Sequence, residues 1–257
     1  MNAEIICVGS EILLGDIVNT NAVFLSKGLA ELGINVHYQT VVGDNEQRLI
    51  DALKIAYSRS DIVVTTGGLG PTKDDITKEA VAKFFQKELI YNEDIYNTIK
   101  NYLKKKYNKD TISPSNRKQA YVPDGAITIE NSVGTAPGIF LTDKNKTALL
   151  LPGPPKEAEH VFTLASERHL KRLSSSTILS ANLILKGIGE SIAADEISSY
   201  LDLKNPTVAP YAKEDCVVIR ITASGESKET CISAIQPVAN EICEILKPYI
   251  HSIKFPS

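Results

Sequence analysis

The 257-residue sequence has no tryptophan, a single methionine and only 6% aromatic residues, yet 43% of it is hydrophobic. Its apolar side chains are therefore mainly aliphatic, and they are numerous enough for a substantial core. A large excess of one charge is also missing, because 28 basic and 31 acidic residues leave a net charge of -3. This balance gives no global attraction to nucleic acid or to an anionic membrane, and we expect neither as a partner. Any phosphate binding must come from a local site.

Closely spaced cysteine pairs, of the kind that zinc ribbons and redox dithiols use, are absent as well. We expect the four cysteines to be reduced and mostly buried thiols. No run of eighteen apolar residues occurs, and residues 1–4 pass into strand-like sequence without a basic and apolar leader. These absences favour a cytoplasmic protein.

The most informative stretch, residues 61–77, contains three patterns in succession, typical of a strand, a glycine loop and a helix start. An apolar, β-branched run predicts a buried strand, and three glycines within four positions follow it: Gly67, Gly68 and Gly70. Thr72 and Asp75 fit the Ser/Thr-x-x-acid pattern that opens helices. The stretch thus predicts a cradle of backbone N–H groups at a helix N-terminus, beside Asp74 and Asp75. Because carboxylates repel a bare phosphate, the pattern indicates a phosphate ligand bridged by a metal ion.

Strand, loop and helix repeat three times in the first third of the chain, with strands expected at 3–8, 34–42 and 61–66. This order predicts a parallel sheet. Right-handed crossovers place the loops after parallel strands along one edge, so the loops at Gly9, Gly43 and Gly67 should converge. Two further strands, at 139–142 and 147–151, form a hairpin that makes the sheet mixed.

A second pattern begins where the composition turns basic and serine-rich at residues 171–176. We therefore expect two domains, 1–170 and 171–257. Strand 177–185, helix 191–201, a strand pair within 207–222 and helix 228–249 give the β-α-β-β-α order of KH-like modules. KH modules clamp nucleic acid with a GXXG loop, which this segment lacks, so the sequence does not favour RNA binding.

Several candidate residues have two interpretations. Asp44 is either the cap of the helix after it, which the local sequence favours, or a metal ligand at the end of a strand. Arg117 is either a phosphate ligand or a partner in a surface ion pair. The prolines before Lys156 form either a stiff strand-to-helix turn or a helix N-terminus that faces the same edge as the glycine loop.

Four motifs in this order resemble the CinA (competence/damage-inducible protein A) family, whose N-terminal module is similar to molybdopterin-binding domains. They are residues 9–15 (GSEILLG), 66–75 (TGGLGPTKDD), 116–120 (NRKQA) and 151–157 (LPGPPKE). The resemblance covers nearly the whole chain. It implies a three-layer α/β/α domain with a mostly parallel mixed sheet, followed by a small α+β KH-like domain. Relatives that handle molybdopterin generally have threonine where Leu69 stands, which weakens the inference of pterin binding.

The resemblance further implies hydrolysis of the pyrophosphate bond of ADP-ribose, with a divalent cation such as Mg²⁺ or Co²⁺, to AMP and ribose 5-phosphate. FAD, NAD and related dinucleotides share the same diphosphate. A homodimer is expected by resemblance alone. Many family members carry a third domain that deamidates nicotinamide mononucleotide, and we do not expect that activity from these residues.

The residues that match the family motifs are the candidate site. The candidates for catalysis are Asp75, Asp44, Lys73 and Glu11. The candidates for metal binding are Asp44, Asp74 and Asp75. The candidates for substrate binding are Gly9, Ser10, Asn21, Gly67, Gly68, Leu69, Gly70, Thr72, Asn116, Arg117, Gln119, Pro152, Gly153 and Lys156. The alternative function is a module that binds a pterin or nucleotide without cleaving it, since no Ser-His or Cys-His nucleophile pair is evident.

Overall fold

The computed structural model describes residues 1–108, 113–173 and 177–255, and the chain divides into two compact units. The first comprises Met1–Leu29 and Asn35–Leu173, and the second comprises Ala30–Ile34 and Ser174–Ser257. The domain boundary expected after residue 170 falls within a short 3₁₀ helix, η2 (Leu170–Arg172), and residues 174–176 lie outside the described residues. Among the described residues, no helix has the length and apolar character needed to cross a membrane.

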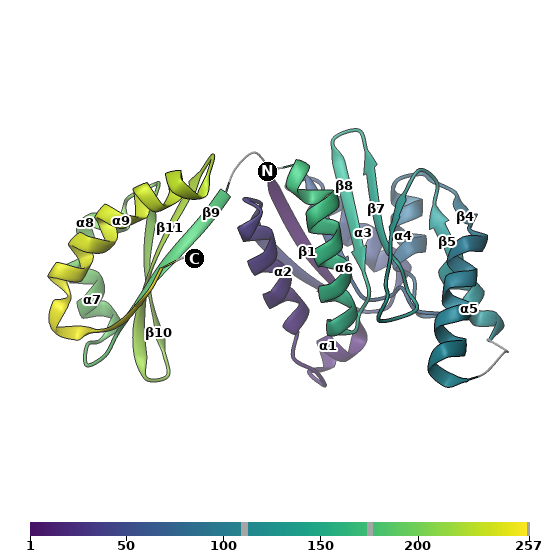
Figure 1. The fold of residues 1–257 in the computed structure, drawn as a ribbon, viewed down its shortest axis with the longest axis horizontal. Coiled ribbons are helices and arrows are strands. Elements are labelled where there is room, and N and C mark those ends of the chain that lie inside the picture. The colour runs from purple at the N-terminus through teal and green to yellow at the C-terminus, as the bar shows by residue number, and fades with distance from the viewer. Residues whose placement is uncertain (109–112, 174–176, 256–257) are drawn as a thin grey trace. The chain divides into compact units, whose positions relative to one another are not determined.

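The first unit is built on a six-stranded sheet (Figure 1). In spatial order its strands are β2 (Asn35–Val42), β1 (Asn2–Val8), β3 (Ile62–Thr66), β8 (Lys146–Leu151), β7 (Gly138–Asp143) and β6 (Ile127–Ile129). The first four strands are parallel, and β7 runs antiparallel between β8 and β6. This confirms the mixed, mostly parallel sheet.

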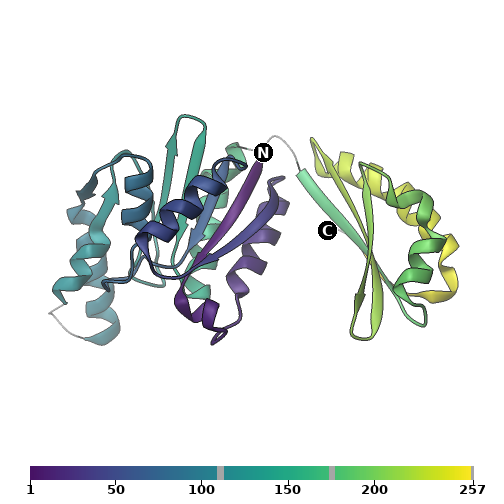
Figure 2. The same ribbon diagram turned by 180° about the vertical axis from the view of Figure 1, so that it is seen from behind.

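Helices cover both faces of this sheet. Its main helices are α2 (Thr20–Glu31), α3 (Glu46–Ala56), α4 (Thr77–Phe84) and α6 (Pro155–Arg168). In Figure 1, α2 and α6 lie in front of the sheet, whereas α3 and α4 come forward in Figure 2. All five residues of β3 are buried because the strand has neighbours on both edges and helices on both faces. The three-layer α/β/α prediction is confirmed, and the apolar run at 62–66 was its clearest signal.

Short elements of the first unit differ from the expectation. Three strands of three residues each, β4 (Leu89–Tyr91), β5 (Tyr121–Pro123) and β6, were not predicted. Strands this short carry too little alternation to be recognised in a sequence. The unit also contains the five-residue α1 (Ser10–Leu14), α5 (Glu93–Tyr107) and the 3₁₀ helix η1 (Pro114–Ala120). Helix α1 contacts β2, and η1 contacts α5.

The second unit has a four-stranded antiparallel sheet, with helices packed through one apolar core. Its strands in spatial order are β10 (Thr207–Lys213), β11 (Cys216–Gly225), β9 (Thr177–Leu185) and β12 (Ile250–Lys254). The helices are α7 (Glu190–Glu196), α8 (Ser198–Leu201) and α9 (Lys228–Ile245). The expected order is confirmed, with β12 added as a fourth strand.

Two predicted helices of the second unit are shorter in the structure. The helix expected at 191–201 is interrupted at Ile197, which separates α7 from α8 and is fully buried in the core. The helix expected to reach residue 249 ends at Ile245, and a 3₁₀ turn, η3 (Lys247–Tyr249), follows. Pro248 lies in this turn and cannot donate the hydrogen bond that a continuing α-helix needs.

Candidate functional site

The loops that follow the parallel strands meet at one edge of the main sheet. The N–H of Gly9 donates to the carbonyl of Val42 (3.0 Å), and the N–H of Gly67 donates to the carbonyl of Leu151 (3.0 Å). A Cβ atom at Gly67 would lie 2.1 Å from the carbonyl oxygen of Val8. The ends of β1, β2, β3 and β8 are therefore in direct contact, and the predicted convergence of the three glycine loops is confirmed.

Asp44 joins the loop after β2 to the loop after β1. Its Oδ2 accepts hydrogen bonds from the backbone N–H (2.9 Å) and the hydroxyl (2.7 Å) of Ser10. The prediction that Asp44 caps the following helix is wrong, because the cap of α3 is Asn45, whose side chain accepts from the N–H of Arg48 (3.0 Å). The two residues are adjacent polar residues before one helix, so the sequence alone did not separate their roles.

Asn21 connects three segments of this edge. Its amide nitrogen donates to the hydroxyl of Thr66 at the end of β3 and to the carbonyl of Gly153, both at 2.8 Å. The Thr66 hydroxyl in turn donates to the carbonyl of Pro152 (2.8 Å). The predicted substrate-binding residues Asn21, Pro152 and Gly153 are thus held together by a hydrogen-bonded chain.

The glycine loop has a backbone that only glycine adopts readily. Gly67 and Gly68 have φ angles of 100° and 68°. Thr77, the first residue of α4, returns to the loop, because its hydroxyl donates to the carbonyl of Gly67 (2.8 Å) and its N–H to that of Gly68 (3.0 Å). The side chain of Leu69 is buried in the core of the first unit. Within the described part of the chain, no acceptor takes the N–H groups of residues 68–70.

The acid loop, residues 72–75, follows and lies before the helix rather than inside it. Both the N–H (2.8 Å) and the hydroxyl (2.5 Å) of Thr72 donate to Oδ2 of Asp75, and the hydroxyl also contacts Asp74. The predicted helix start at Thr72 is wrong, because α4 begins at Thr77 with Ile76 as its cap residue. The Thr-x-x-Asp pattern here closes a loop, in which Thr72 and Asp75 pair before the helix begins.

Glycine and hydrogen bonding set the position of the acidic side chains in the acid loop. A Cβ atom at Gly70 would lie 2.5 Å from Oδ2 of Asp75, so the carboxylate occupies the space that a side chain would fill. The hydroxyl of Thr72 lowers the pKa of Asp74, which lies fully at the surface. Both carboxylates of the acid loop therefore face Thr72.

The other proposed acidic and basic side chains are separate from one another. Glu11 folds its carboxylate over Gly9, where an added Cβ would lie 2.6 Å from Oε1. Lys73 is exposed, and in the described part of the chain no hydrogen bond or ion pair joins it to another residue. Among these residues, no group of three His, Cys, Asp or Glu side chains is arranged to hold a metal ion. Asp44 and Asp75 therefore belong to two local clusters.

The 3₁₀ helix η1 contributes a buried amide. Gln119 donates to Oγ1 of Thr135 (3.0 Å) and to the carbonyl of Leu69 (3.4 Å), and its Oε1 accepts from Asn116 (3.2 Å). Gln119 thus contacts the main chain of the glycine loop at Leu69, and Asn116 holds the Gln119 side chain. Arg117 points elsewhere, with its guanidinium 4.6 Å from the ring centroid of Tyr91. This contact is neither of the two expected for Arg117.

Two lysines near the acid loop were missed by sequence reasoning. Lys78 in α4 is 2% exposed, and burial lowers its pKa from the usual 10.5 to about 8. Its ammonium donates to the carbonyls of Lys118 (2.7 Å) and Tyr121 (3.0 Å). Lys118 donates to the carbonyls of Thr72 (2.9 Å) and Asp75. A lysine among the apolar positions of α4 was the available signal for Lys78.

Glu157, in the first turn of α6, is the last residue of the motif at 151–157, and the sequence did not predict a role for it. Its Oε2 accepts from the side chain of Asn131 (2.7 Å), and burial raises its pKa. Gly134 lies directly beneath it, because an added Cβ there would be 1.8 Å from Oε2. Glu157 therefore anchors the loop 132–138 to the start of α6.

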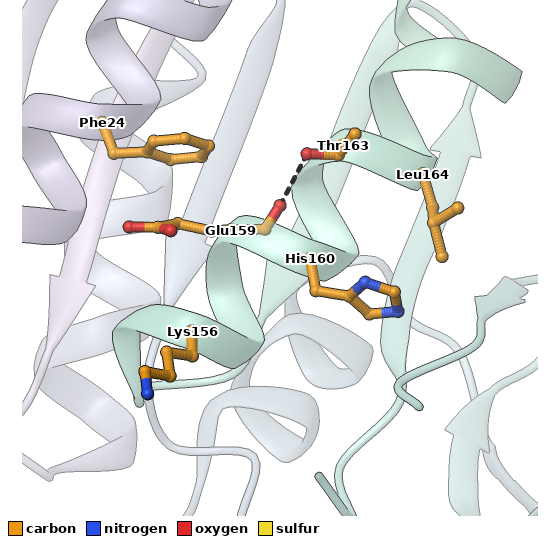
Figure 3. A pocket seen from close by; sticks show the side chains of 6 residues that line it. All are labelled: Phe24, Lys156, Glu159, His160, Thr163 and Leu164. Atoms are coloured by element: carbon orange, nitrogen blue, oxygen red, sulfur yellow. Dashed lines mark hydrogen bonds between the residues drawn. The ribbon is translucent and has the colours of Figure 1, made fainter. Parts of the chain in front are cut away.

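Lys156, one residue earlier, faces a different hollow. It lines a cavity of about 390 Å³ between α2 and α6, with Phe24, Glu159, His160, Thr163 and Leu164 (Figure 3). In Figure 3 the Lys156 side chain extends beside the first turn of α6, away from the ring of His160. The structure thus places Lys156 on the α2–α6 surface, and among the described residues no hydrogen bond or ion pair joins it to the glycine loop.

Comparison with known proteins finds two matching family models and several relatives of similar sequence. A family model described as a probable molybdopterin binding domain matches residues 4–172, and one described as the damage-inducible protein CinA KH domain matches residues 180–252. A protein of Clostridium beijerinckii named as competence-damage inducible is 50% identical over 94% of this chain and 59% of its own length. A CinA-like protein of Kosmotoga olearia is 48% identical over 98% and 61%.

A solved structure agrees with the fold of the first unit. It is the protein CinA with unknown function from Thermoplasma acidophilum, 40% identical, with a TM-score of 0.58 over 65% of this chain and 96% of that chain. The present chain spans about three fifths of the length of the curated relatives it matches.

Proposed function

The chain belongs to the CinA family, and we propose that its first unit is a nucleotide pyrophosphatase that depends on a divalent metal ion. The proposed substrate is ADP-ribose or a related dinucleotide such as FAD or NAD, and the products are AMP and a sugar phosphate. The choice of ADP-ribose follows the family resemblance of the four motifs. The choice of a diphosphate rests on the geometry of the site.

One observation carries the proposal: the three consecutive N–H groups of residues 68–70 find no acceptor in the described part of the chain, and they lie beside the acid loop. Leu69 is buried and Gly68 and Gly70 are half-buried, and backbone N–H groups withdrawn from solvent are nearly always paired, so this row is suited to an external acceptor. Phosphate oxygens are strong acceptors, and backbone N–H groups in a glycine loop commonly bind them. The neighbouring carboxylates require a cation when a phosphate is bound.

Two carboxylates each keep one oxygen available to a hard divalent cation. Asp44 and Asp75 each use Oδ2 to accept hydrogen bonds, and in the described residues no donor contacts either Oδ1. Mg²⁺ is typically held by one or two carboxylates together with substrate phosphates and water. The candidate ligands to such an ion are Asp75 and Asp74 in the acid loop, and Asp44 in its separate cluster with Ser10. When bound, it would offset phosphate charge and acidify a coordinated water.

The chain's own groups account for the remaining requirements of hydrolysis. Residues 68–70 orient the diphosphate. The exposed ammonium of Lys73, in the adjacent acid loop, offsets negative charge on the phosphate oxygens. Water adds to one phosphorus atom while the bond from that phosphorus to the bridging oxygen breaks. Asp75 or Glu11 takes the proton from the water, and the departing phosphate carries away the bridging oxygen.

A substrate panel tests this function. Purified protein is incubated with ADP-ribose, FAD or NAD, each with Mg²⁺, with Co²⁺ or with a chelator, and AMP is quantified. Asp75→Asn keeps the size of the side chain but removes its charge, and turnover should fall at least about 100-fold. Asp51→Asn is the matched control, because Asp51 forms an exposed ion pair with Lys54 on α3. Metal-dependent turnover that is equal in both variants would refute the role of Asp75.

A module that binds without cleaving is the second candidate. It is favoured by the hydrogen bonds that Asp44 and Asp75 already accept from Ser10 and Thr72, which give both carboxylates a role in holding loops. Calorimetric titration with ADP-ribose distinguishes the two functions. Tight binding without formation of AMP supports the module, whereas metal-dependent AMP formation supports the enzyme.

We also propose a homodimer, on the basis of family resemblance. Sedimentation equilibrium over a range of protein concentrations tests it, with a mass near 56 kDa expected from a chain of 28.0 kDa. A mass that stays at that of one chain contradicts the dimer.

A further inference from the structure

Lys78 is buried at a place where a positive charge is unfavourable. It is the second residue of α4, and the N-terminus of a helix repels cations. Its side chain is 2% exposed, and its ammonium donates to two backbone carbonyls at the end of η1, those of Lys118 and Tyr121. An apolar residue would fill this position at a lower electrostatic cost. The lysine therefore has a specific task, which is to hold the end of η1 against α4.

Lys118 makes the return connection. From η1 its ammonium reaches back to the loop before α4 and donates to the carbonyls of Thr72 (2.9 Å) and Asp75. It also lies 3.5 Å from Oε1 of Glu79. The two residues whose carbonyls it binds are the first and last residues of the acid loop. Lys118 thus fixes this loop at both ends.

Lys78 and Lys118 together link α4, η1 and the acid loop in a closed ring of hydrogen bonds, which we call the strap. Lys78 ties α4 to η1, and Lys118 ties η1 to the acid loop, which leads directly back into α4. The carbonyls of Thr72 and Asp75 accept hydrogen bonds from Lys118. The Asp75 carboxylate accepts from the N–H and the hydroxyl of Thr72. Lys118 therefore holds the backbone of the acid loop, and Thr72 holds the Asp75 side chain.

We propose that Lys78 and Lys118 are positioning residues that hold the Asp75 carboxylate at the glycine loop. Neither residue needs to touch the substrate for this role. The catalytic consequence rests on the proposed function, whereas the effect on the loop is independent of it. A displacement of about 1 Å can reduce turnover about 100-fold, so loss of either ammonium should act mainly on kcat.

The variants Lys118→Met and Lys78→Met remove the ammonium and retain an unbranched side chain. Lys83→Met is the matched control, since Lys83 is also in α4 but forms an exposed ion pair with Glu46. For each protein, kcat and KM are measured with ADP-ribose and Mg²⁺, and hydrogen–deuterium exchange is followed in residues 70–77. We expect Lys118→Met to lower kcat about 100-fold with KM changed less than about threefold, and exchange in 70–77 to accelerate.

Lys118→Ala with added propylammonium supplies a second measurement. The side chain of Lys118 is 27% exposed, so a small amine has access to the vacated position. Recovery of kcat with propylammonium, and no recovery for Asp75→Asn under the same conditions, supports positioning by the ammonium. Should Lys118→Met fail to fold, Lys118→Arg retains the charge but changes the direction of the donors, and full activity of that variant overturns the proposal.

The outcomes separate the strap from the enzyme activity. If wild-type protein forms no AMP, the proposed function fails, and exchange in residues 70–77 still decides whether the lysines hold the acid loop. If exchange and kcat in Lys118→Met and Lys78→Met equal those of Lys83→Met, the strap is refuted while the pyrophosphatase stands.

Discussion

Ser10 gives both its backbone N–H and its hydroxyl to a single oxygen of Asp44, across the ends of two adjacent parallel strands. The carboxylate is therefore positioned by the loop after β1, although it belongs to the loop after β2. Among the described residues, no donor contacts its second oxygen. Substitutions at the two residues should separate the hydrogen-bonding role of Asp44 from the metal-binding role that we propose for it.

Asp44→Asn retains the side-chain shape but removes the charge that a cation would bind. We expect turnover of ADP-ribose to fall about 100-fold and the Mg²⁺ concentration for half-maximal activity to rise. Ser10→Ala removes the hydroxyl bond while leaving the N–H bond, and it should lower unfolding free energy by about 1 kcal/mol. Steady-state kinetics across a Mg²⁺ series and urea denaturation measure the two effects. Equal Mg²⁺ dependence in wild type and Asp44→Asn would exclude Asp44 as a ligand.

Asn21→Ala should destabilise the first unit without altering its fold. Two hydrogen bonds at 2.8 Å, to Thr66 and Gly153, are lost, and the expected cost is about 2 kcal/mol. Asn97→Ala, at an exposed position of α5, is the control. Urea denaturation followed by circular dichroism gives both free energies, and similar values for the two variants would contradict a clamp at Asn21.

Gly67→Ala and Gly125→Ala separate backbone strain from steric overlap. Both glycines have positive φ, at 100° and 77°, so alanine at either position costs about 1–2 kcal/mol. Nothing lies within 4 Å of an added Cβ at Gly125, whereas at Gly67 the carbonyl oxygen of Val8 would be 2.1 Å away. We expect Gly67→Ala to lose more than about 4 kcal/mol or to be insoluble. Equal melting temperatures for the two variants would show that the glycine loop and β1 separate readily.

The pKa of Glu157 predicts a pH dependence of stability. Burial raises this pKa above its usual 4.5, against the opposing effects of Asn131 and Lys106. Between 4.5 and the raised value the folded protein binds more protons than the unfolded chain, so stability falls as pH rises through this window. Glu157→Gln should remove that part of the dependence, so its stability relative to wild type should increase as the pH rises above 4.5. Parallel pH profiles of the two proteins, from chemical denaturation, would contradict this assignment.

The sequence predicted the strands and helices that have strong apolar patterns, and failed where a role depends on which neighbour is reached. The run at 62–66 and the hairpin at 138–151 were evident because continuous burial leaves a continuous apolar run. Asn45 rather than Asp44 as the cap, and a loop rather than a helix at Thr72, depend on backbone geometry that a four-residue pattern does not specify.

The candidate site was predicted as a set of loops and less well as a set of side chains. Parallel topology dictates that the loops after β1, β2, β3 and β8 converge, and glycine spacing marks the cradle. Lys78 and Lys118 escaped notice because each acts on main-chain carbonyls of a segment about 40 residues away. Main-chain partners leave no trace in residue type, so such contacts become visible only in three dimensions.

The position of β3 between β1 and β8 has a consequence for the growing chain on the ribosome. β1, β2 and β3 are complete once residue 66 has emerged, but β8 begins 80 residues later, at Lys146. Until then one edge of a fully buried, β-branched strand has no partner, and open edges of this kind favour pairing between chains. The order of synthesis therefore leaves one edge of β3 open to such pairing until the β7–β8 hairpin is made and β8 covers it.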